Sequence, residues 1–523
     1  MEFMRNYTKI LLTILLCSIA SSGIWAQNIW DAHRFSQQFN EGTARSVAMG
    51  NASVALGGDI GAISINPAAS GVYRFNEFVF TPSITVANST TDYLGTKTSS
   101  SKTRFGIPNF GYVGSFSTGR QNTGLINWNI AVTYNKTNNF TSRMSASGKT
   151  AKSSWLSALA QNTNGIYAPN MDMNMSNDPF YTTNIGWTSI LGWNTSLLDT
   201  LPDSPIDYIA ATENINGTDI VIAGELQQNF TKESIGNTSE AVINFGGNIS
   251  NKLFFGINIG ITSIWYQYNE VYSESAVNPS QFDSQFGNFS HYYSQTTSGT
   301  GVNLKAGVIY LPTDGLRIGA SISTPTWMVL YDEWEEQMRT NFTDGYSQQL
   351  SSPLGSYNYK LNTPFRWNIG AAYTFGQLGA ISIDYENTNY SAMKFKEVNN
   401  YQSDTFGYEN QAIKDNFKSS SVVRAGVEIN ATPQLAIRGG YQYYQSGYKH
   451  DDTTVQVGSI GLGYAAKGGF FADVACAKSF SKETFYLYDD IINPDNNAVI
   501  TAAPAGVNKY GSWKILLSVG LRF

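Results

Sequence analysis

WKILLSVGLRF, residues 513–523, is the stretch that decides the fold class of this chain. Successive side chains of a strand point to opposite faces, so one face here is wholly apolar and carries Trp513, Ile515, Leu517, Val519, Leu521 and Phe523. The other face is mostly small or cationic, and a slip of one residue would put Lys514 and Arg522 into lipid at about 2–4 kcal/mol each. The length suits a strand that crosses a bilayer in about 9–11 residues. The stretch predicts a transmembrane strand, with a half-buried strand of a soluble sandwich as the alternative.

The N-terminus predicts export from the cytoplasm. Arg5 and Lys9 precede an apolar run over residues 10–20, and small residues follow, which is the pattern of a secretory signal peptide. We expect residues 1–26 to be the signal peptide, cleaved before Gln27, because the apolar run is too short for a spanning helix. Cys476 is the one cysteine left after cleavage, so the mature sequence offers no disulfide and no cysteine-based metal site.

The composition favours a membrane barrel over a soluble domain. Charged residues make up 14% of the chain, against about 25% in soluble proteins, while aromatic residues reach 14%. No long uncharged apolar run follows the signal, so a closed β-barrel is the natural way to satisfy the backbone groups in lipid. The formal net charge of −6 and the lack of a basic stripe argue against a nucleic-acid partner.

Alternating apolar residues from Phe78 onward predict an all-β, transmembrane antiparallel β-barrel over residues 76–523. Short turn signals fall near residues 119–124, 251–252, 312–315, 376–379, 431–434 and 467–468, and longer connections separate them. Six short turns and seven outer connections give about fourteen strands, with both ends in the periplasm. A lumen of that width needs a plug, and the segment 27–75, rich in small residues, is available to supply it. A flexible periplasmic extension is the alternative for this segment.

Two interruptions of the alternation point to function. The polar run 136–139 breaks a strand before Phe140 and predicts a kink that includes Asn135 and Asn138. Residues 148–236 form the largest excursion, which we expect to be an extracellular loop with its own function. Its apolar side chains should be covered or should capture a hydrophobic ligand, and the candidates are Trp155, Leu159, Trp187, Leu191 and Trp193.

Motifs for catalysis, metals or cofactors are weak. His33, His291 and His450 are far apart in the sequence and show no ligand spacing, so we expect no metal site and no cofactor. Matches to Ser-x-x-Lys at Ser391 and Ser479 lack the partner motifs that such nucleophilic chemistry needs. We therefore expect a protein that is not an enzyme.

Several motifs resemble the FadL/TodX family of outer-membrane transporters for long-chain fatty acids and other hydrophobic compounds. GTARSVAMG (42–50), ALGGD (55–59) and NPA (66–68) resemble its N-terminal region, and the terminal Phe523 resembles the last residue of outer-membrane barrels. The likeness continues through STP (323–325), TPFR (363–366), DYE (384–386), NYS (389–391) and RGGY (438–441).

The resemblance implies a fourteen-stranded barrel whose N-terminal hatch closes the lumen and gates an internal pocket. The plug and gating residues would be Trp30, Phe35, Gly42, Arg45, Gly50, Gly58, Asp59, Asn66, Pro67 and Ala68. A kink near residues 135–140 of the third strand, 125–147, would open the wall toward lipid, and a capture groove would lie in residues 153–201. Three arginines would face the lumen by the alternation of their strands and are candidates to bind a ligand carboxylate: Arg317, Arg366 and Arg438.

Together these expectations predict a protein that takes up long-chain fatty acids or other hydrophobic small molecules. Uptake would occur by passive, ligand-gated diffusion with lateral exit. The location would be the outer membrane of a Gram-negative bacterium, with membrane lipid and lipopolysaccharide as surroundings and a monomer as the assembly state. Two alternatives stay open. A PorV-type barrel of a secretion system would carry a protein partner on its outer loops, and a general porin would have an open, polar lumen.

Overall fold

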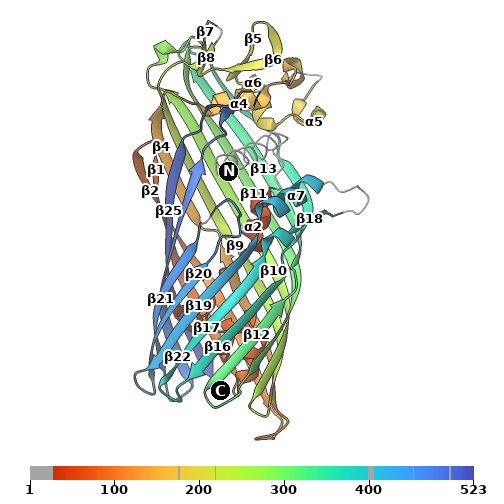
Figure 1. Cartoon of the computed structure of the whole chain (residues 1–523), viewed down its shortest axis with the longest axis vertical. Coiled ribbons are helices and arrows are strands. Elements are labelled where there is room, and N and C mark those ends of the chain that lie inside the picture. The colour runs from red at the N-terminus through yellow and green to blue at the C-terminus, as the bar shows by residue number, and fades with distance from the viewer. Residues whose placement is uncertain are drawn as a thin grey trace, which may run out of the picture.

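The computed structural model describes residues 28–174, 177–217, 219–398, 406–451, 453–493, 496 and 498–523. Over these residues the chain forms a closed antiparallel barrel of 14 strands with a partly helical cap at one end (Figure 1). The predicted all-β barrel and its number of strands are confirmed. The predicted signal peptide, residues 1–26, and Gln27 lie outside the described residues.

Each pass through the wall contains one long strand that pairs antiparallel with its neighbours. In chain order these strands are β1 (Glu77–Tyr93), β2 (Thr96–Ser117), β3 (Leu125–Asn139), β9 (Leu226–Ile249), β10 (Leu253–Ala276), β11 (Phe286–Tyr310), β12 (Leu316–Ser323), β16 (Arg366–Thr374), β17 (Gly379–Asn389), β19 (Ser419–Asn430), β20 (Leu435–Tyr444), β21 (Val455–Ala465), β22 (Phe470–Tyr486) and β25 (Ala505–Arg522). The barrel closes where β25 pairs with β1, with Ile515 opposite Ile84 and Leu521 opposite Phe78. All four of these side chains are exposed on the outer face, as the alternation predicted.

Some passes are split toward the cap. β13 (Trp327–Phe342) continues β12 along β11, and Pro325 lies in the break between them. Pro364 likewise separates β15 (Gly355–Asn362) from β16, because proline has no N–H to donate to a ladder. The remaining extensions are β4 (Ser142–Thr150), β14 (Ser347–Ser351) and β18 (Lys394–Glu397).

The two ends of the barrel differ in their connections. The short turns gather at the end where the chain terminates, and the cap covers the opposite end (Figure 1). Gly315 and Asn251 take positive φ angles of 86° and 60° in two of these turns. Short turns are periplasmic in outer-membrane barrels, so the cap is extracellular.

The cap consists mainly of residues 151–225. This range is shorter than the predicted 148–236, because β4 runs to Thr150 and β9 begins at Leu226. It contains α4 (Trp155–Thr163), η3 (Ala168–Met171), α5 (Pro179–Thr182), α6 (Trp187–Asn194), β5 (Leu198–Leu201), β6 (Ser204–Ala210), β7 (Glu213–Asn216) and β8 (Asp219–Ile222). Other outer elements are η4 (Pro279–Gln281), η5 (Tyr390–Ala392), α7 (Gly407–Asn416), β23 (Ile491–Ile492) and β24 (Val499–Thr501). Among the described helices, none has the length and apolar character needed to cross a membrane.

Residues 28–75, called the N-terminal segment below, pack against the lumen-facing side of the wall. The segment contains α2 (Ile29–Ser36), α3 (Ala44–Ala48), η1 (Gly61–Ser64) and η2 (Pro67–Val72). α3 contacts β20, β21 and β22, whereas η2 contacts β9, β10 and β11 on another part of the wall. From residue 41 to residue 73, every side chain is buried except Arg45, Gly58, Asp59 and Val72.

Close approach of two backbones explains why small residues dominate this contact. A Cβ at Gly256 of β10 would overlap the carbonyl group of Pro67. A Cβ at Gly440 of β20 would overlap the backbone nitrogen of Gly50. Glycine is the residue that permits such proximity, so the wall and the N-terminal segment fit each other through their main chains.

We expect Gly440→Val to push the residues around Gly50 off the wall, since the valine side chain needs the space of that backbone. Overpacking of this kind costs about 1–3 kcal/mol. Single-channel recording should show a several-fold higher conductance, while the heat-modifiable barrel band on a gel persists.

Gly439→Val is the matched control, because Gly439 shares the outward face with Ile437 and Tyr441. A Cβ there lies 3.7 Å from Val427, an ordinary contact. Equal conductance of the two variants would contradict the packing argument.

Candidate functional site

α2 occupies an aromatic pocket formed by the wall and α7. The side-chain oxygen of Asn28 accepts a hydrogen bond from the Asp31 N–H at 3.0 Å and so caps the first turn of the helix. Ala32 and Phe35 are buried in the pocket. Its other buried members are Phe140, Ile264, Tyr266, Met328, Leu330, Tyr359, Leu361, Tyr390, Met393, Phe395, Phe406, Ile413 and Phe417. A concave, mostly apolar site of this kind suits a hydrophobic ligand.

Ring contacts hold α2 in place. The centroid of Phe35 lies 6.0 Å from that of Phe140 and 5.8 Å from that of Tyr266. Trp30 lies 5.8 Å from Phe417 in an edge-to-face contact, but 43% of its surface is exposed. Such pairs contribute about 0.5–1.5 kcal/mol beyond area burial. The structure therefore brings together Phe35 and Phe140, which the sequence placed in the gate and in the kink.

α2 also carries ionisable groups into the pocket. The ring of His33 lies 4.7 Å from that of Tyr390 and 4.9 Å from that of Phe417, and its Nε2 is buried without a hydrogen-bond partner among the described residues. Burial, and secondarily the charge of Arg34, lower the pKa of His33 to about 4. Asp31 forms an ion pair with Arg34, yet burial raises the pKa of its carboxyl group.

A cavity of about 160 Å³ lies beside α2, and its charged lining residues are Arg366 and Asp451. Arg366, one of the predicted carboxylate ligands, lines it and forms an ion pair with Glu386. Glu386 also binds Arg424 at 2.7 Å, and two nitrogens of the fully buried Arg424 have no hydrogen-bond partner among the described residues. The sequence analysis missed Arg424, although its alternation with Val423 and Ala425 marks it as lumen-facing. The cavity is smaller than a typical ligand site of about 300–1,000 Å³, because α2 fills the space next to it.

The other two predicted carboxylate ligands are not near α2. Arg317 donates a hydrogen bond to the Leu56 carbonyl at 2.6 Å. Arg438 forms ion pairs with Glu428, at 2.6 Å, and with Asp473. Both arginines sit near the short-turn ends of their strands, so they hold the periplasmic part of the lumen together. Lumen-facing parity identified the correct face but carries no information about height along the barrel axis.

Ion pairs fix the N-terminal segment at its centre. Arg45 binds both carboxylate oxygens of Glu428 on β19, at 2.9 and 3.1 Å, and donates to the Gly58 carbonyl at 3.2 Å. The hydroxyl of Thr43 donates to Asp59 at 2.8 Å. Removing one partner of a buried pair leaves an uncompensated charge at about 3–5 kcal/mol. Of the predicted plug residues, Arg45 joins the segment to the wall, whereas Asp59 binds within the segment.

The Asn-Pro-Ala motif forms a second anchor. The side-chain oxygen of Asn66 accepts from the Ala68 N–H at 3.0 Å, and Pro67 begins η2 directly after this cap. The side-chain amide of Asn66 donates to the Val308 carbonyl of β11 at 3.2 Å. The predicted glycines occupy left-handed positions, with φ angles of 52°, 62° and 67° at Gly42, Gly50 and Gly58.

The wall has a gap between its second and third passes. The β2–β3 ladder ends at the pair Asn109–Asn135. Toward the cap, β4 pairs with β9, and none of its described residues forms a ladder with β2. The break between β3 and β4 lies at Phe140, whose N–H donates to the Gly236 carbonyl at 3.1 Å. The predicted kink residues therefore lie where the β2–β3 ladder ends and the chain passes from β3 to β4.

The N-terminal segment closes this gap from the lumen. The Phe39 N–H donates to the Thr137 carbonyl at 2.7 Å. The Glu41 N–H donates to the Lys136 carbonyl at 3.0 Å. The side-chain amide of Asn138 donates to further backbone carbonyls of the same segment. The chain that follows α2 thus supplies hydrogen-bond donors to the displaced strand.

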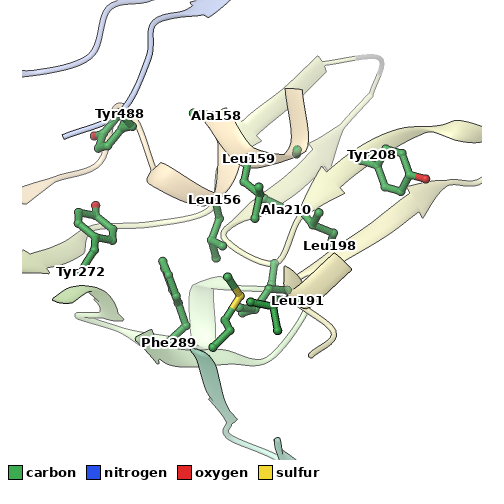
Figure 2. Close-up of a cluster of buried hydrophobic side chains, with 14 of the residues drawn as sticks. Leu156, Ala158, Leu159, Leu191, Leu198, Tyr208, Ala210, Tyr272, Phe289 and Tyr488 are labelled. Carbon is green, nitrogen blue, oxygen red and sulfur yellow. The ribbon is translucent and has the colours of Figure 1, made fainter. Parts of the chain in front are cut away.

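The cap has a hydrophobic core of its own. Figure 2 shows Leu159 of α4 and Leu191 of α6 among converging side chains, with Phe289 of β11 below them. Leu159 and Leu191 are buried, so they stabilise the cap and do not form the wall of an open capture groove. The remaining capture candidates are partly buried at the edge of this core: Trp155, Trp187 and Trp193.

The histidines do not gather into a metal centre. His291 forms a 3.1 Å contact with Glu336, and His33 lies in the pocket of α2. Within the described ranges, no group of three or more His, Cys, Asp or Glu residues is arranged to hold a metal ion.

The sequence and the fold are both similar to those of known proteins. Residues 216–497 match the family model described as outer membrane protein transport protein (OMPP1/FadL/TodX). A Pseudomonas aeruginosa FadL homologue is 12% identical, with 93% of this chain and 100% of that chain covered and a TM-score of 0.50. A TodX monoaromatic hydrocarbon channel mutant is 14% identical, with the same coverages and TM-score.

The Pseudomonas putida toluene transporter TodX is 14% identical, with 93% of this chain and 99% of that chain covered and a TM-score of 0.49. No curated protein matches the sequence. The structural likeness at these identities concerns the fold, while the family model spans more than half of the chain. The protein therefore belongs to the FadL/TodX family of outer-membrane transport proteins and resides in the outer membrane of a Gram-negative bacterium.

Proposed function

We propose that this protein takes up hydrophobic small molecules by passive diffusion, and that displacement of α2 by the ligand gates the passage. The observation that carries the proposal is the burial of Phe35 and Ala32 in a pocket of aromatic and aliphatic side chains. α2 is a removable occupant, because side-chain contacts of Phe35 and Ala32 hold it in the pocket. The protein acts as a monomer surrounded by lipid and lipopolysaccharide and needs no cofactor.

The energies of ligand binding and helix release are comparable. Burying a phenylalanine side chain contributes about 1.5–3 kcal/mol, and each methylene group of a ligand contributes about 0.8 kcal/mol. A chain of roughly four buried methylenes therefore offsets the loss of the Phe35 contact. A long-chain fatty acid meets this requirement easily, and so do other large hydrophobic molecules. Arg366, which lines the cavity beside α2, suits a carboxylate.

The exit is lateral, through the gap between the second and third passes. Phe39 and Glu41 bind the displaced strand and directly follow α2, so movement of the helix loosens the same contacts. The straight route to the periplasm is filled by the buried residues of the N-terminal segment. A hydrophobic molecule thus leaves the barrel into the membrane without crossing water. Ligands reach the pocket from the cap, where Trp155, Trp187 and Trp193 provide apolar surface.

The alternatives make different demands on the lumen. A general porin needs an open aqueous channel, and the buried N-terminal segment works against one. A PorV-type function would place a protein partner on the cap. Native mass spectrometry of gently solubilised protein separates these functions, because co-purifying fatty acid supports transport and a stoichiometric protein partner supports secretion.

Phe35→Ala should strengthen binding of a long-chain fatty acid by about tenfold or more, since the ligand no longer competes with a buried ring worth about 1.5–3 kcal/mol. Isothermal titration calorimetry in detergent measures this. Trp30→Ala, on the same helix but half exposed, should change the affinity less.

Deleting residues 28–39 should raise both fatty-acid uptake and ion leak in proteoliposomes. Unchanged uptake in this variant, or weaker binding by Phe35→Ala, would show that α2 does not compete with the ligand.

Docking of α2 should weaken in mild acid through His33. Its pKa is about 4 in the pocket and about 6.5 in the released helix, so the released state binds the proton first. The docking free energy then falls by about 1.4 kcal/mol per pH unit between pH 6.5 and pH 4. Single-channel leak recorded at pH 7.5 and pH 5 tests this.

His33→Gln isolates the histidine contribution, because the raised pKa of Asp31 makes that group favour docking as the pH falls. Subtracting the variant's pH profile from the wild-type profile should leave increased leak at pH 5. Identical profiles would remove His33 from the gating mechanism.

A further inference from the structure

The lateral gap contains a lysine at a position that should face lipid. Lys136 follows Val132 and Tyr134 on β3 at two-residue spacing, and Val132 is exposed on the outer face. Nevertheless Lys136 is only 8% exposed. A Cβ on Gly106 of β2 would lie 2.7 Å from its Nζ. The lysine side chain therefore fills the space between β2 and the displaced third pass.

An arginine reaches into the same gap from the other side. In the sheet, β3 and β9 stand between β2 and β10, yet the guanidinium carbon of Arg104 on β2 lies 5.8 Å from the ring centroid of Trp265 on β10. Such a contact requires the guanidinium to cross the space that the third pass vacates. Nη1 of Arg104 is buried and has no hydrogen-bond partner among the described residues.

The gap carries excess positive charge. Glu41 of the N-terminal segment lies 3.8 Å from the Nζ of Lys136 and also forms an ion pair with Lys514 of β25. One carboxylate is therefore shared by two lysines, and Arg104 adds a third cation. Glu233, closer to the cap, is engaged by Lys102 at 2.7 Å.

These charges lie at the depth of the apolar belt. Arg104 is opposite Thr85, and Gly106 is opposite Ser83. Ile84, between these two positions on β1, is exposed on the outer face and is the partner of Ile515. Ser83 and Thr85 are buried, so their partners on β2 share the lumen-facing side of the wall. Ionisable residues at membrane depth mark substrate and ion pathways.

We propose that Arg104 and Lys136 form an anion site in the lateral gap that holds the carboxylate of an amphiphilic cargo while its hydrocarbon tail enters the membrane. The inference rests on the proposed lateral exit and names the substrate class: long-chain monocarboxylates in preference to neutral hydrocarbons. The guanidinium offers a planar pair of donors to a carboxylate, and the lysine offers a point charge. A lipid phosphate shares this anionic oxygen chemistry, so the test has to separate the two sources.

The test compares two cargoes of equal length in proteoliposomes, hexadecanoic acid and hexadecanol, with the wild-type protein and with Arg104→Gln/Lys136→Met. We expect the double variant to transport the acid about tenfold more slowly and the alcohol at the wild-type rate. Lys102→Met is the matched control, because Lys102 projects from the same face of β2 but has Glu233 as its partner. It should leave both rates unchanged.

Equal slowing of acid and alcohol in the double variant would overturn the anion site, since it would indicate a structural role. An unchanged acid rate together with loss of bound phosphatidylglycerol in native mass spectrometry would also overturn it and assign the cations to a lipid headgroup. Transport of neither compound by the wild-type protein would overturn the proposed uptake function itself. Transport of both at equal rates in all three proteins would overturn the anion site alone.

Discussion

A strand in lipid needs backbone partners on both edges, and this requirement governs the whole molecule. Closure of β25 onto β1 satisfies it around the wall. The exception is the part of β2 above Asn109, where the third pass turns into the lumen. The N-terminal segment supplies donors to that displaced strand, and the side chains of Arg104 and Lys136 occupy the space on its outer side. Polar groups therefore collect where the β2–β3 ladder ends.

The width of the barrel makes the N-terminal segment necessary. A lumen enclosed by fourteen strands is too wide for wall side chains alone to fill, and a compact segment of small residues packs here against the wall by main-chain contact. The two parts of the segment are held by different kinds of contact. Its centre is held by ion pairs and hydrogen bonds through Arg45 and Asn66, whereas α2 is held mainly by aromatic contacts. In the proposed gating, a hydrophobic ligand replaces the second kind of contact and not the first.

The cations of the lumen differ in how well they are neutralised. Near the periplasm, Arg438 binds two carboxylates, and these ion pairs neutralise its charge. Beside α2, Glu386 is shared by Arg366 and Arg424, and Asp384 is the residue of β17 opposite Arg424. At the lateral gap, Lys136 and Lys514 share Glu41, and Arg104, which lies over Trp265, forms no ion pair among the described residues. Neutralisation therefore varies along the lumen, and Arg317 near the periplasm has a carbonyl group in place of a carboxylate as its partner.

The sequence by itself determined the barrel, its number of strands, its short turns and the family, because each depends on local patterns: period-two alternation, turn residues and short motifs. Parity along a strand also fixed which side chains face the lumen. It could not place Arg438 and Arg366 at different heights, nor show that Leu159 and Leu191 are buried under the rest of the cap. Strand register and the path of residues 28–75 decide those positions, and both arise from contacts between residues hundreds of positions apart. Only the tertiary structure brought Arg104 across the gap to Trp265, because that contact exists solely where the third pass has left the wall.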